Sequence, residues 1–274
     1  MDHIATKRIM ADMKELHKEP LDKDGIYHHF NPDNLTEARF MIIGPEGTPY
    51  HNGFYLFYLK FPPNYPFVPP RMTYCTVSGN MRFNPNLYAD GKVCLSILNT
   101  WEGPKWTSCC TVRTIMLTLR ALVLGTAYPL QNEPGYEHNV SADTTMYNDM
   151  ILHENFRVAV VRMLTCPPKG FEMFQTDMYA HVKTNLEYYQ TMLSQLQVFN
   201  QRHVVCRAYN LSIRCDYTTI LKDLTAFMKR KTPLESAKEF PVGHTAAALY
   251  DGRMYIVQLV GPKEKAFKRW VLLK

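Results

Sequence analysis

The most informative residues of this chain run from Phe83 to Leu98 and read Phe-Asn-Pro-Asn-Leu-Tyr-Ala-Asp-Gly-Lys-Val-Cys-Leu-Ser-Ile-Leu. The Asn-Pro-Asn tripeptide at 84–86 and Gly91 break regular structure, whereas residues 93–98 are apolar and compact. The pattern predicts a long ordered loop that carries Cys94, and long loops in compact domains are often functional. A cysteine in an apolar run is usually structural, because a buried thiol packs as a small hydrophobe.

Outside this loop the residue patterns predict an α+β fold. Residues 2–18 form an amphipathic pattern that ends at Glu19-Pro20, because the residue before a proline avoids the helical region. Strand-like runs follow at 38–43, 54–61 and 71–76, and the turn signals between them favour an antiparallel sheet of about four strands. Helical patterns return at 111–124, 143–165, 171–199 and 216–231. Asp251-Gly252 lies between apolar runs at 246–250 and 254–259 and predicts a hairpin.

The composition indicates a folded protein of one extended domain or two domains, with 274 residues, 46% of them hydrophobic. No apolar run approaches the roughly 18 residues that span a bilayer, and the first residues lack the apolar stretch of a signal peptide. We therefore expect a cytoplasmic protein that can also be nuclear, with no membrane partner. The net charge of +6 is modest, so we expect no nucleic-acid partner.

Seven cysteines are present, an odd number with no CxxC spacing. Neither a disulfide framework nor a zinc site is predicted, because a zinc site needs about four converging ligands. We expect no metal. The remaining candidate for a functional cysteine is Cys94, which the segment around it singles out.

The segment 83–98 resembles the active-site segment of ubiquitin-conjugating enzymes. In that family a His-Pro-Asn tripeptide precedes the catalytic cysteine, and its Asn lies eight positions before the Cys, as Asn86 does before Cys94. Residues 44–54 are similar to the family's early turn and strand, 61–70 to its proline-rich loop, and Asn132-Glu133-Pro134 to its acidic loop. Four motifs in the same order are far more specific than any one of them.

The resemblance is greatest to the large Z-type members, which also have Asn-Pro-Asn, a Leu-Ser-Ile-Leu run after the cysteine, and the insertion matched here by residues 100–106. It is strong over 1–165, thinner to about 231 and absent from 232–274. It implies a catalytic core at 1–165, with an N-terminal helix, a four-stranded antiparallel meander and C-terminal helices. A helical extension at 166–240 and a β-hairpin tail at 241–274 complete the expected organisation.

The resemblance implies that Cys94 accepts ubiquitin or a ubiquitin-like modifier as a thioester from an activating enzyme. A substrate lysine or a ligase then takes the modifier. Attack by the lysine builds negative charge on the carbonyl oxygen, and Asn86 is the matching oxyanion donor. The same side chain can also simply shape the loop. ATP is used by the activating enzyme, so no cofactor is expected on this chain.

Further site residues follow from the same resemblance. Glu133 is the expected acceptor of the lysine proton, with Ser96 and Tyr88 as further gate residues, although Glu133 can also merely cap its loop. Lys7 and Arg8 match positions that meet the activating enzyme; the alternative is two solvated helix charges. Phe67 and Ser108 match ligase contacts, but Thr107-Ser108-Cys109 stands where many members have Ser-Pro-Ala. This departure puts pairing with familiar ligases in doubt.

Two other functions remain open at this stage. The chain can be a non-catalytic binding module of the same fold, although the presence of Cys94 and Asn86 argues against this. It can also be a thiol hydrolase of modifier conjugates, which needs a base beside the thiol. The expected partners are the modifier, the activating enzyme, a ligase and protein substrates. Thioester chemistry requires an accessible Cys94 sulfur within reach of the Asn86 carboxamide.

Overall fold

The computed structural model describes residues 3–79, 81–138, 140–230, 240–248, 253–260 and 266–273. The principal elements, joined by short 3-10 and π turns, are α1 (His3–Lys18), β1 (Ile26–Phe30), β2 (Glu37–Ile43), β3 (Phe54–Lys60), β4 (Arg71–Tyr74), α2 (Val112–Thr118), α3 (Ala142–Glu154), α4 (Met163–Thr165), α5 (Gln175–Thr184), α6 (Leu186–Gln195), β5 (His203–Cys206), β6 (Leu211–Arg214), α7 (Tyr217–Met228), β7 (Thr245–Ala247), β8 (Met254–Val260) and β9 (Phe267–Leu272).

The core of the fold is a four-stranded antiparallel meander in the order β1-β2-β3-β4. Its register places Phe40 opposite Phe57 and Phe57 opposite Tyr74. The α+β class and the meander are confirmed. The strand that lacked a clear signal is β1, because its two central residues, His28 and His29, interrupt the apolar pattern.

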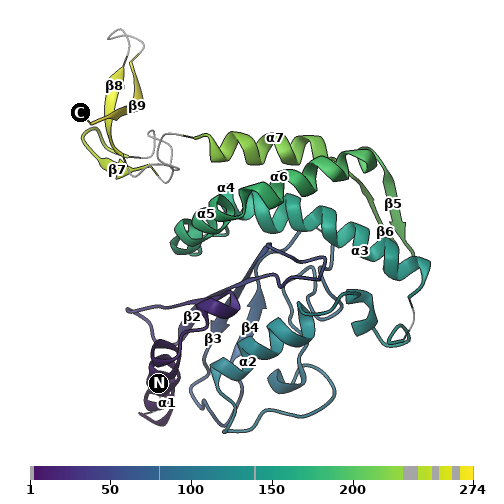
Figure 1. Ribbon diagram of the computed structural model, residues 1–274. Helices are drawn as coiled ribbons and strands as arrows, with labels where there is room; N and C mark the ends of the chain where they lie inside the picture. The colour runs from purple at the N-terminus through teal and green to yellow at the C-terminus, as the bar shows by residue number, and fades with distance from the viewer. Residues whose placement is uncertain are drawn as a thin grey trace.

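Both faces of this sheet are covered by helices (Figure 1). One face carries Phe40 and Phe57, and His28 on this face meets His17 of α1 with ring centroids 5.3 Å apart. Alternation along a strand directs Met41 and Leu56 to the opposite face, where both are fully buried. The chain after residue 154 covers that second face. The sheet is therefore a middle layer.

Contacts between the second face and the extension are specific. The ring of His181 in α5 lies edge-on to Phe54 at 5.8 Å, and the guanidinium of Arg39 lies 6.0 Å from the ring of Phe171. The Tyr189 hydroxyl of α6 donates a hydrogen bond of 2.7 Å to the carbonyl of Asn52. The extension thus shares one continuous hydrophobic core with the sheet.

The helix predicted at 143–165 is present as α3, a π-helical stretch from Asn155 to Arg162, and α4. The helical stretch predicted at 171–199 is present, but it is divided, because α5 and α6 are separated at Asn185. The Asn185 side chain donates to the carbonyl of His181 at 2.9 Å. Such local bonds compete with the regular helical pattern.

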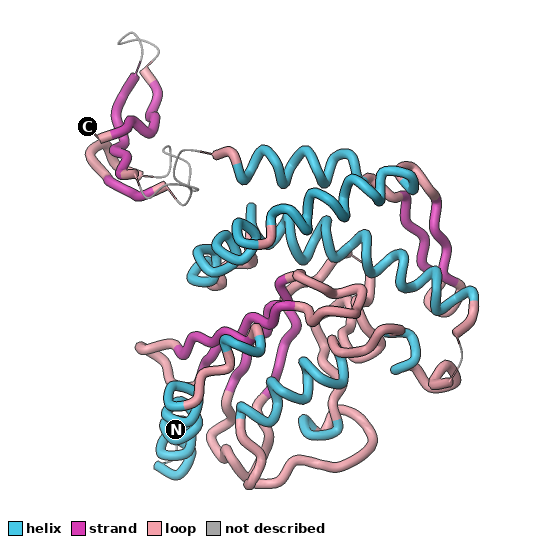
Figure 2. Tube along the Cα trace, viewed as in Figure 1, coloured by secondary structure: helices cyan, strands magenta, loops and turns pink. Residues whose placement is uncertain are grey.

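Two features of the remaining chain were not predicted. The antiparallel pair β5–β6 follows α6 and stands at one end of the helical layer (Figure 2). In the tail, β7 and β8 pair as expected, but β9 adds a third strand, so the predicted hairpin is a three-stranded sheet. The turn residues Asp251-Gly252 lie outside the described residues. The tail has its own small core around Val257 and Trp270.

Candidate active site

Cys94 and Asn86 are joined by two hydrogen bonds. The backbone N–H of Cys94 donates to the Asn86 carbonyl at 2.9 Å, and Nδ2 of Asn86 donates to the Cys94 carbonyl at 2.8 Å. This pair fixes the carboxamide beside the backbone of the cysteine. The loop therefore holds these two residues side by side.

Asn84 is hydrogen-bonded to Asn86 and anchors it to the core. Its Oδ1 accepts from the N–H of Asn86 at 2.8 Å, and its Nδ2 donates to the Tyr50 hydroxyl at 3.0 Å and to the Val123 carbonyl at 2.9 Å. Asn84 is fully buried, so these partners also remove the cost of burying a polar amide. The first Asn of the tripeptide therefore orients the second.

The expectation of an accessible Cys94 thiol is wrong for this structure, because Cys94 is only 1% exposed. The residue lies between Val93 and Leu95, both buried. Thr100 fixes this run: its hydroxyl donates to the Val93 carbonyl at 2.8 Å and accepts from the Leu95 N–H at 2.9 Å. The segment that carries Cys94 is thus held in a fixed, buried conformation.

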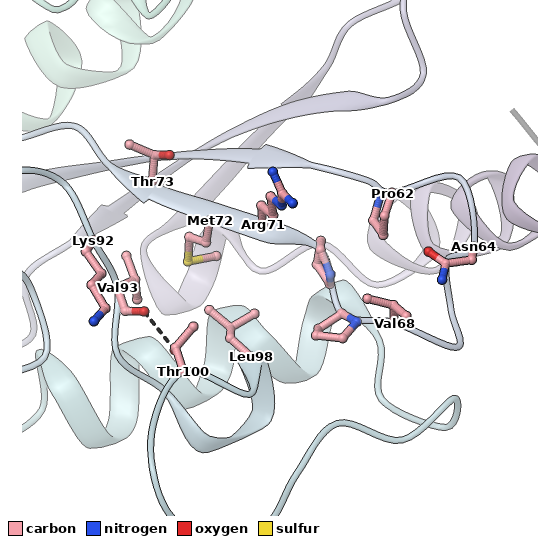
Figure 3. A pocket seen from close by; sticks show the side chains of 12 residues that line it. Pro62, Asn64, Val68, Arg71, Met72, Thr73, Lys92, Val93, Leu98 and Thr100 are labelled. Carbon is pink, nitrogen blue, oxygen red and sulfur yellow. Dashed lines mark hydrogen bonds between the residues drawn. The ribbon is translucent and has the colours of Figure 1, made fainter.

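A hollow of about 530 Å³ lies beside this segment, between the proline-rich loop and the start of β4 (Figure 3). Its wall includes Lys92 and Val93, which directly precede Cys94, and Leu98 and Thr100, which follow it. Arg71 and Lys92 add positive charge to its rim. The active-site segment therefore borders an open surface even though its thiol is covered.

The three predicted gate residues are all partly buried, and Tyr88 and Glu133 belong to one cluster. Glu133 follows a 3-10 turn whose Asn132 reaches Asn84 at 3.4 Å, which places the acidic loop against the active-site segment. The guanidinium of Arg82 lies 3.6 Å from the centroid of the Tyr88 ring. Glu133 Oε2 accepts a hydrogen bond from the Tyr209 hydroxyl. Ser96 lies separately, at the start of the turn after Cys94.

The residues predicted to contact the activating enzyme, Lys7 and Arg8, lie in the first half of α1, and Arg8 contacts the 107–110 loop. Arg8 donates to the carbonyls of Ser108 and Cys110, each at 2.6 Å, and to Asp12 at 2.9 Å. Its charge therefore already serves to hold the 107–110 loop against the helix, whereas Lys7 is exposed. The contact with the activating enzyme that was predicted for Lys7 and Arg8 stays a prediction.

Phe67 is 67% exposed at the tip of the proline-rich loop. The loop is held from below by Trp106, whose Nε1–H donates to the Pro66 carbonyl at 2.6 Å. Tyr65, next in the loop, is buried and donates to Asp12 of α1. Phe67 and Ser108 are thus exposed on segments that are both anchored to α1. Their ligase role stays a prediction.

Sequence reasoning missed Arg82 and Tyr209. The Arg82 guanidinium contacts two rings, with centroids at 3.6 Å for Tyr88 and 4.8 Å for Tyr209. Arg82 directly precedes the active-site segment, so its position was a usable signal. Tyr209 had none, because it lies 76 residues after Glu133 in a segment without a clear pattern.

Several histidines have partners away from the loop. His153 bonds to Glu154, His181 to Asn52 and His203 to Ser212. Among the residues that the structure describes, no group of three His, Cys, Asp or Glu side chains is arranged to hold a metal. No helix in the described ranges is long and apolar enough to cross a membrane.

Comparison with known proteins identifies the family of this chain. The family model described as "Ubiquitin-conjugating enzyme" matches residues 8–150. A Xenopus tropicalis protein named "Ubiquitin-conjugating enzyme E2 Z" is 38% identical over 226 residues, which cover 71% of each chain. Proteins of the same name from Danio rerio and Homo sapiens are 39% and 41% identical, over 66% and 58% of this chain.

The match spans about half of these last two relatives, 54% and 45% of their lengths. A solved structure titled "Toxoplasma gondii ubiquitin conjugating enzyme TgTwinScan_2721- E2 domain" aligns over 56% of this chain and 98% of its own, with 22% identity and a TM-score of 0.44. The family model and the frog relative together cover the loop that carries Cys94 and Asn86. The chain belongs to the ubiquitin-conjugating enzyme family and, within it, to the Z type.

Proposed function

We propose that the chain accepts ubiquitin or a ubiquitin-like modifier from an activating enzyme as a thioester on Cys94. It then transfers the modifier to a substrate lysine or to a ligase. The observation that carries this proposal is the hydrogen-bonded pair of Cys94 and Asn86 in a chain of this family. The activating enzyme consumes the ATP, so this chain needs no cofactor of its own. The reaction would take place in the cytoplasm, and also in the nucleus.

The chemistry proceeds in two acyl transfers. The Cys94 thiolate attacks the thioester of the activating enzyme and displaces that enzyme's thiolate. A lysine amine, freed of its extra proton, then attacks the Cys94 thioester. The C–N bond forms, the C–S bond breaks, and the nitrogen gives one of its two remaining protons to the departing thiolate. Negative charge on the carbonyl oxygen is greatest between these events, so a fixed N–H donor lowers the barrier.

Asn86 is the proposed donor. In the uncharged chain its Nδ2–H is bound to the Cys94 carbonyl at 2.8 Å, so it must turn from that carbonyl toward the thioester oxygen. The thioester oxygen belongs to the terminal carbonyl of the modifier, which is attached through the Cys94 side chain, so the donor moves from the backbone of Cys94 to a group carried by its sulfur. Glu133 is the proposed acceptor of the lysine proton.

The burial of Cys94 adds a requirement, because a covered thiol must become exposed before it meets a second protein. Charging therefore needs a rearrangement of the cysteine side chain or of the 93–98 run. The same burial favours a second function, a non-catalytic binding module in which Cys94 is a core residue. The charging reaction separates the two.

The test incubates the chain with activating enzyme, ATP and ubiquitin and resolves the products with and without reductant. We expect an adduct that reductant removes and that Cys94→Ala abolishes. Cys94→Ser should form an oxygen ester that survives reductant. Cys109→Ala changes an exposed cysteine and should leave charging intact. Wild type that stays uncharged with ubiquitin and with other modifiers would exclude the transferase in favour of the binding module.

Asn86 is tested on the loaded chain. We expect Asn86→Ala to be charged but to release its modifier to free lysine about a hundredfold more slowly, because one oxyanion donor is lost. The measurement is single-turnover discharge after the activating enzyme is quenched. Discharge at the wild-type rate would assign Asn86 a purely structural role in the loop.

A further inference from the structure

The turn between β5 and β6 touches the core next to the active-site segment. The N–H of Arg207 donates to Oδ1 of Asp143 at 3.2 Å, and the thiol of Cys206 donates to the Asp143 carbonyl at 3.7 Å. The ring of Tyr209 lies against that of Tyr147, with centroids 5.7 Å apart. Three contacts from four consecutive residues hold the turn in one place.

From this place Tyr209 contacts the predicted gate directly. Its hydroxyl donates to Oε2 of Glu133, and its ring lies 4.8 Å from the guanidinium of Arg82. The same guanidinium lies 3.6 Å from the centroid of the Tyr88 ring, so one cation contacts both rings. The extension therefore reaches Glu133 and the active-site loop through one side chain.

Arg82, which contacts both tyrosine rings, is itself positioned by two hydrogen bonds. The Tyr147 hydroxyl donates to the Arg82 carbonyl at 2.6 Å, and Nη2 of Arg82 donates to the Pro85 carbonyl at 3.2 Å. Pro85 directly precedes Asn86. Arg82 thus contacts both the residue before the proposed oxyanion donor, Asn86, and the tyrosine that binds Glu133.

The direction of the bond between Tyr209 and Glu133 is set by protonation. Burial, followed by the hydrogen bond to Glu133, raises the pKa of Tyr209 well above its ordinary value, so the phenol keeps its proton at neutral pH. A neutral phenol next to a carboxylate acts as the donor. The recorded bond engages one carboxylate oxygen, Oε2, and a carboxylate has further lone pairs for a second partner.

We propose that Tyr209 is a positioning residue for discharge of the modifier: its hydroxyl holds Glu133 in the orientation that accepts the proton of the incoming lysine. This inference rests on the proposed function. The lysine ammonium gives one proton to Glu133, and the neutral amine attacks the Cys94 thioester. The C–N bond forms and the C–S bond breaks. The adduct nitrogen gives one of its two remaining protons to the departing Cys94 thiolate, and Glu133 returns its own proton to water.

The test loads Cys94 with ubiquitin, quenches the activating enzyme and follows discharge to free lysine. We expect Tyr209→Phe to charge normally and to discharge about tenfold more slowly, a part of what a proton acceptor contributes. Discharge to hydroxylamine, which is largely unprotonated at neutral pH, should stay near the wild-type rate. The loss to lysine should shrink as pH rises toward the pKa of the lysine amine.

The matched control is Tyr189→Phe, which removes another hydroxyl that bonds the extension to the core, at the Asn52 carbonyl. It should discharge to lysine like wild type. A general loosening of the extension would slow both variants and both nucleophiles, and that result would overturn the proposal.

A double-mutant cycle closes the test. If Tyr209 acts through Glu133, Glu133→Gln and the double variant Glu133→Gln with Tyr209→Phe should discharge at the same reduced rate. Effects that multiply would overturn the proposal, as would Tyr209→Phe discharging like wild type. Wild type without a thioester on Cys94 would instead refute the proposed function, and the inference with it.

Discussion

Two carboxylates link the core to the extension, and they are bound very differently. Glu154 is buried, and its two oxygens accept from Ser78, Arg157 and His153 at 2.5 to 3.0 Å. Glu133 is half-buried and receives the hydroxyl of Tyr209. A carboxylate surrounded by donors stabilises the fold, whereas one that a single neutral donor contacts keeps lone pairs for a further partner.

The Glu154 cluster reaches the extension through His153. Nδ1 of His153 lies 3.0 Å from Glu154, and its Nε2 lies 3.0 Å from the N–H of Asp216, at the start of α7. A backbone N–H must donate, so Nε2 accepts and the proton of a neutral ring lies on Nδ1, facing the carboxylate. Both ring nitrogens of His153 and both carboxylate oxygens of Glu154 therefore have hydrogen-bond partners.

The largest expected effect comes from removing the charge of Glu154. Glu154→Gln should lower the free energy of unfolding by about 3 kcal/mol, because it removes the charge that pairs with Arg157 and replaces one of the two acceptor oxygens by an NH2 group that faces donors. Urea unfolding at pH 7 measures this. A loss below about 1 kcal/mol would show that the buried cluster adds little stability and would remove the contrast with Glu133.

A smaller loss should follow from Ser78→Ala. The variant removes one neutral donor, at 2.5 Å from Oε2, while Arg157 and His153 keep the carboxylate charged and partnered. We expect about 1.5 kcal/mol of destabilisation in the same urea experiment. An effect as large as that of Glu154→Gln would mean that the serine, rather than the charged donors, holds the junction.

Acid should weaken this junction selectively. Burial alone would raise the pKa of Glu154, but hydrogen bonds from His153, Arg157 and Ser78 outweigh it and lower the pKa from 4.5 to about 2. A lowered folded-state pKa stabilises the fold above about pH 4.5, and this contribution is lost as pH falls toward 2. Between pH 7 and pH 4 the loss should be about 1 kcal/mol, absent in Glu154→Gln. Identical pH profiles would contradict the assignment.

The smallest effect is expected at the other junction. Tyr209→Phe should lower the free energy of unfolding by only about 0.5 kcal/mol, because the freed carboxylate of Glu133 can be hydrated. Thermal unfolding of the variant beside Tyr189→Phe measures this. A loss comparable to that of Glu154→Gln would identify Tyr209 as a structural anchor and remove the distinction between the junctions.

The sequence predicted much of the fold and part of the site. The spacing of Asn86 and Cys94 implies a loop with a fixed carboxamide, and the structure contains that loop with both hydrogen bonds. The meander followed from short apolar runs separated by turns. β1 was the exception, because two histidines at its centre hide the alternation. Local patterns suffice where neighbours in sequence determine the conformation.

Elements beyond residue 165 were harder to predict. The break at Asn185 depends on one side chain that bonds to the preceding turn, and no change of apolar pattern marks it. The pair β5–β6 has four residues in each strand, and its Val205 is exposed. Such short strands carry little periodic signal. Their pairing is fixed by contacts with α3, a separate part of the chain.

By itself the sequence indicated the family and the α+β core, and its resemblance to that family predicted Cys94 and Asn86 as site residues, because such motifs consist of residues that are close together in the chain. Only the tertiary structure decided that Cys94 is covered, that the extension closes the second face of the sheet, and that Tyr209 meets Glu133. Burial and the meeting of distant side chains depend on how whole elements pack, and packing is a property of the assembled chain.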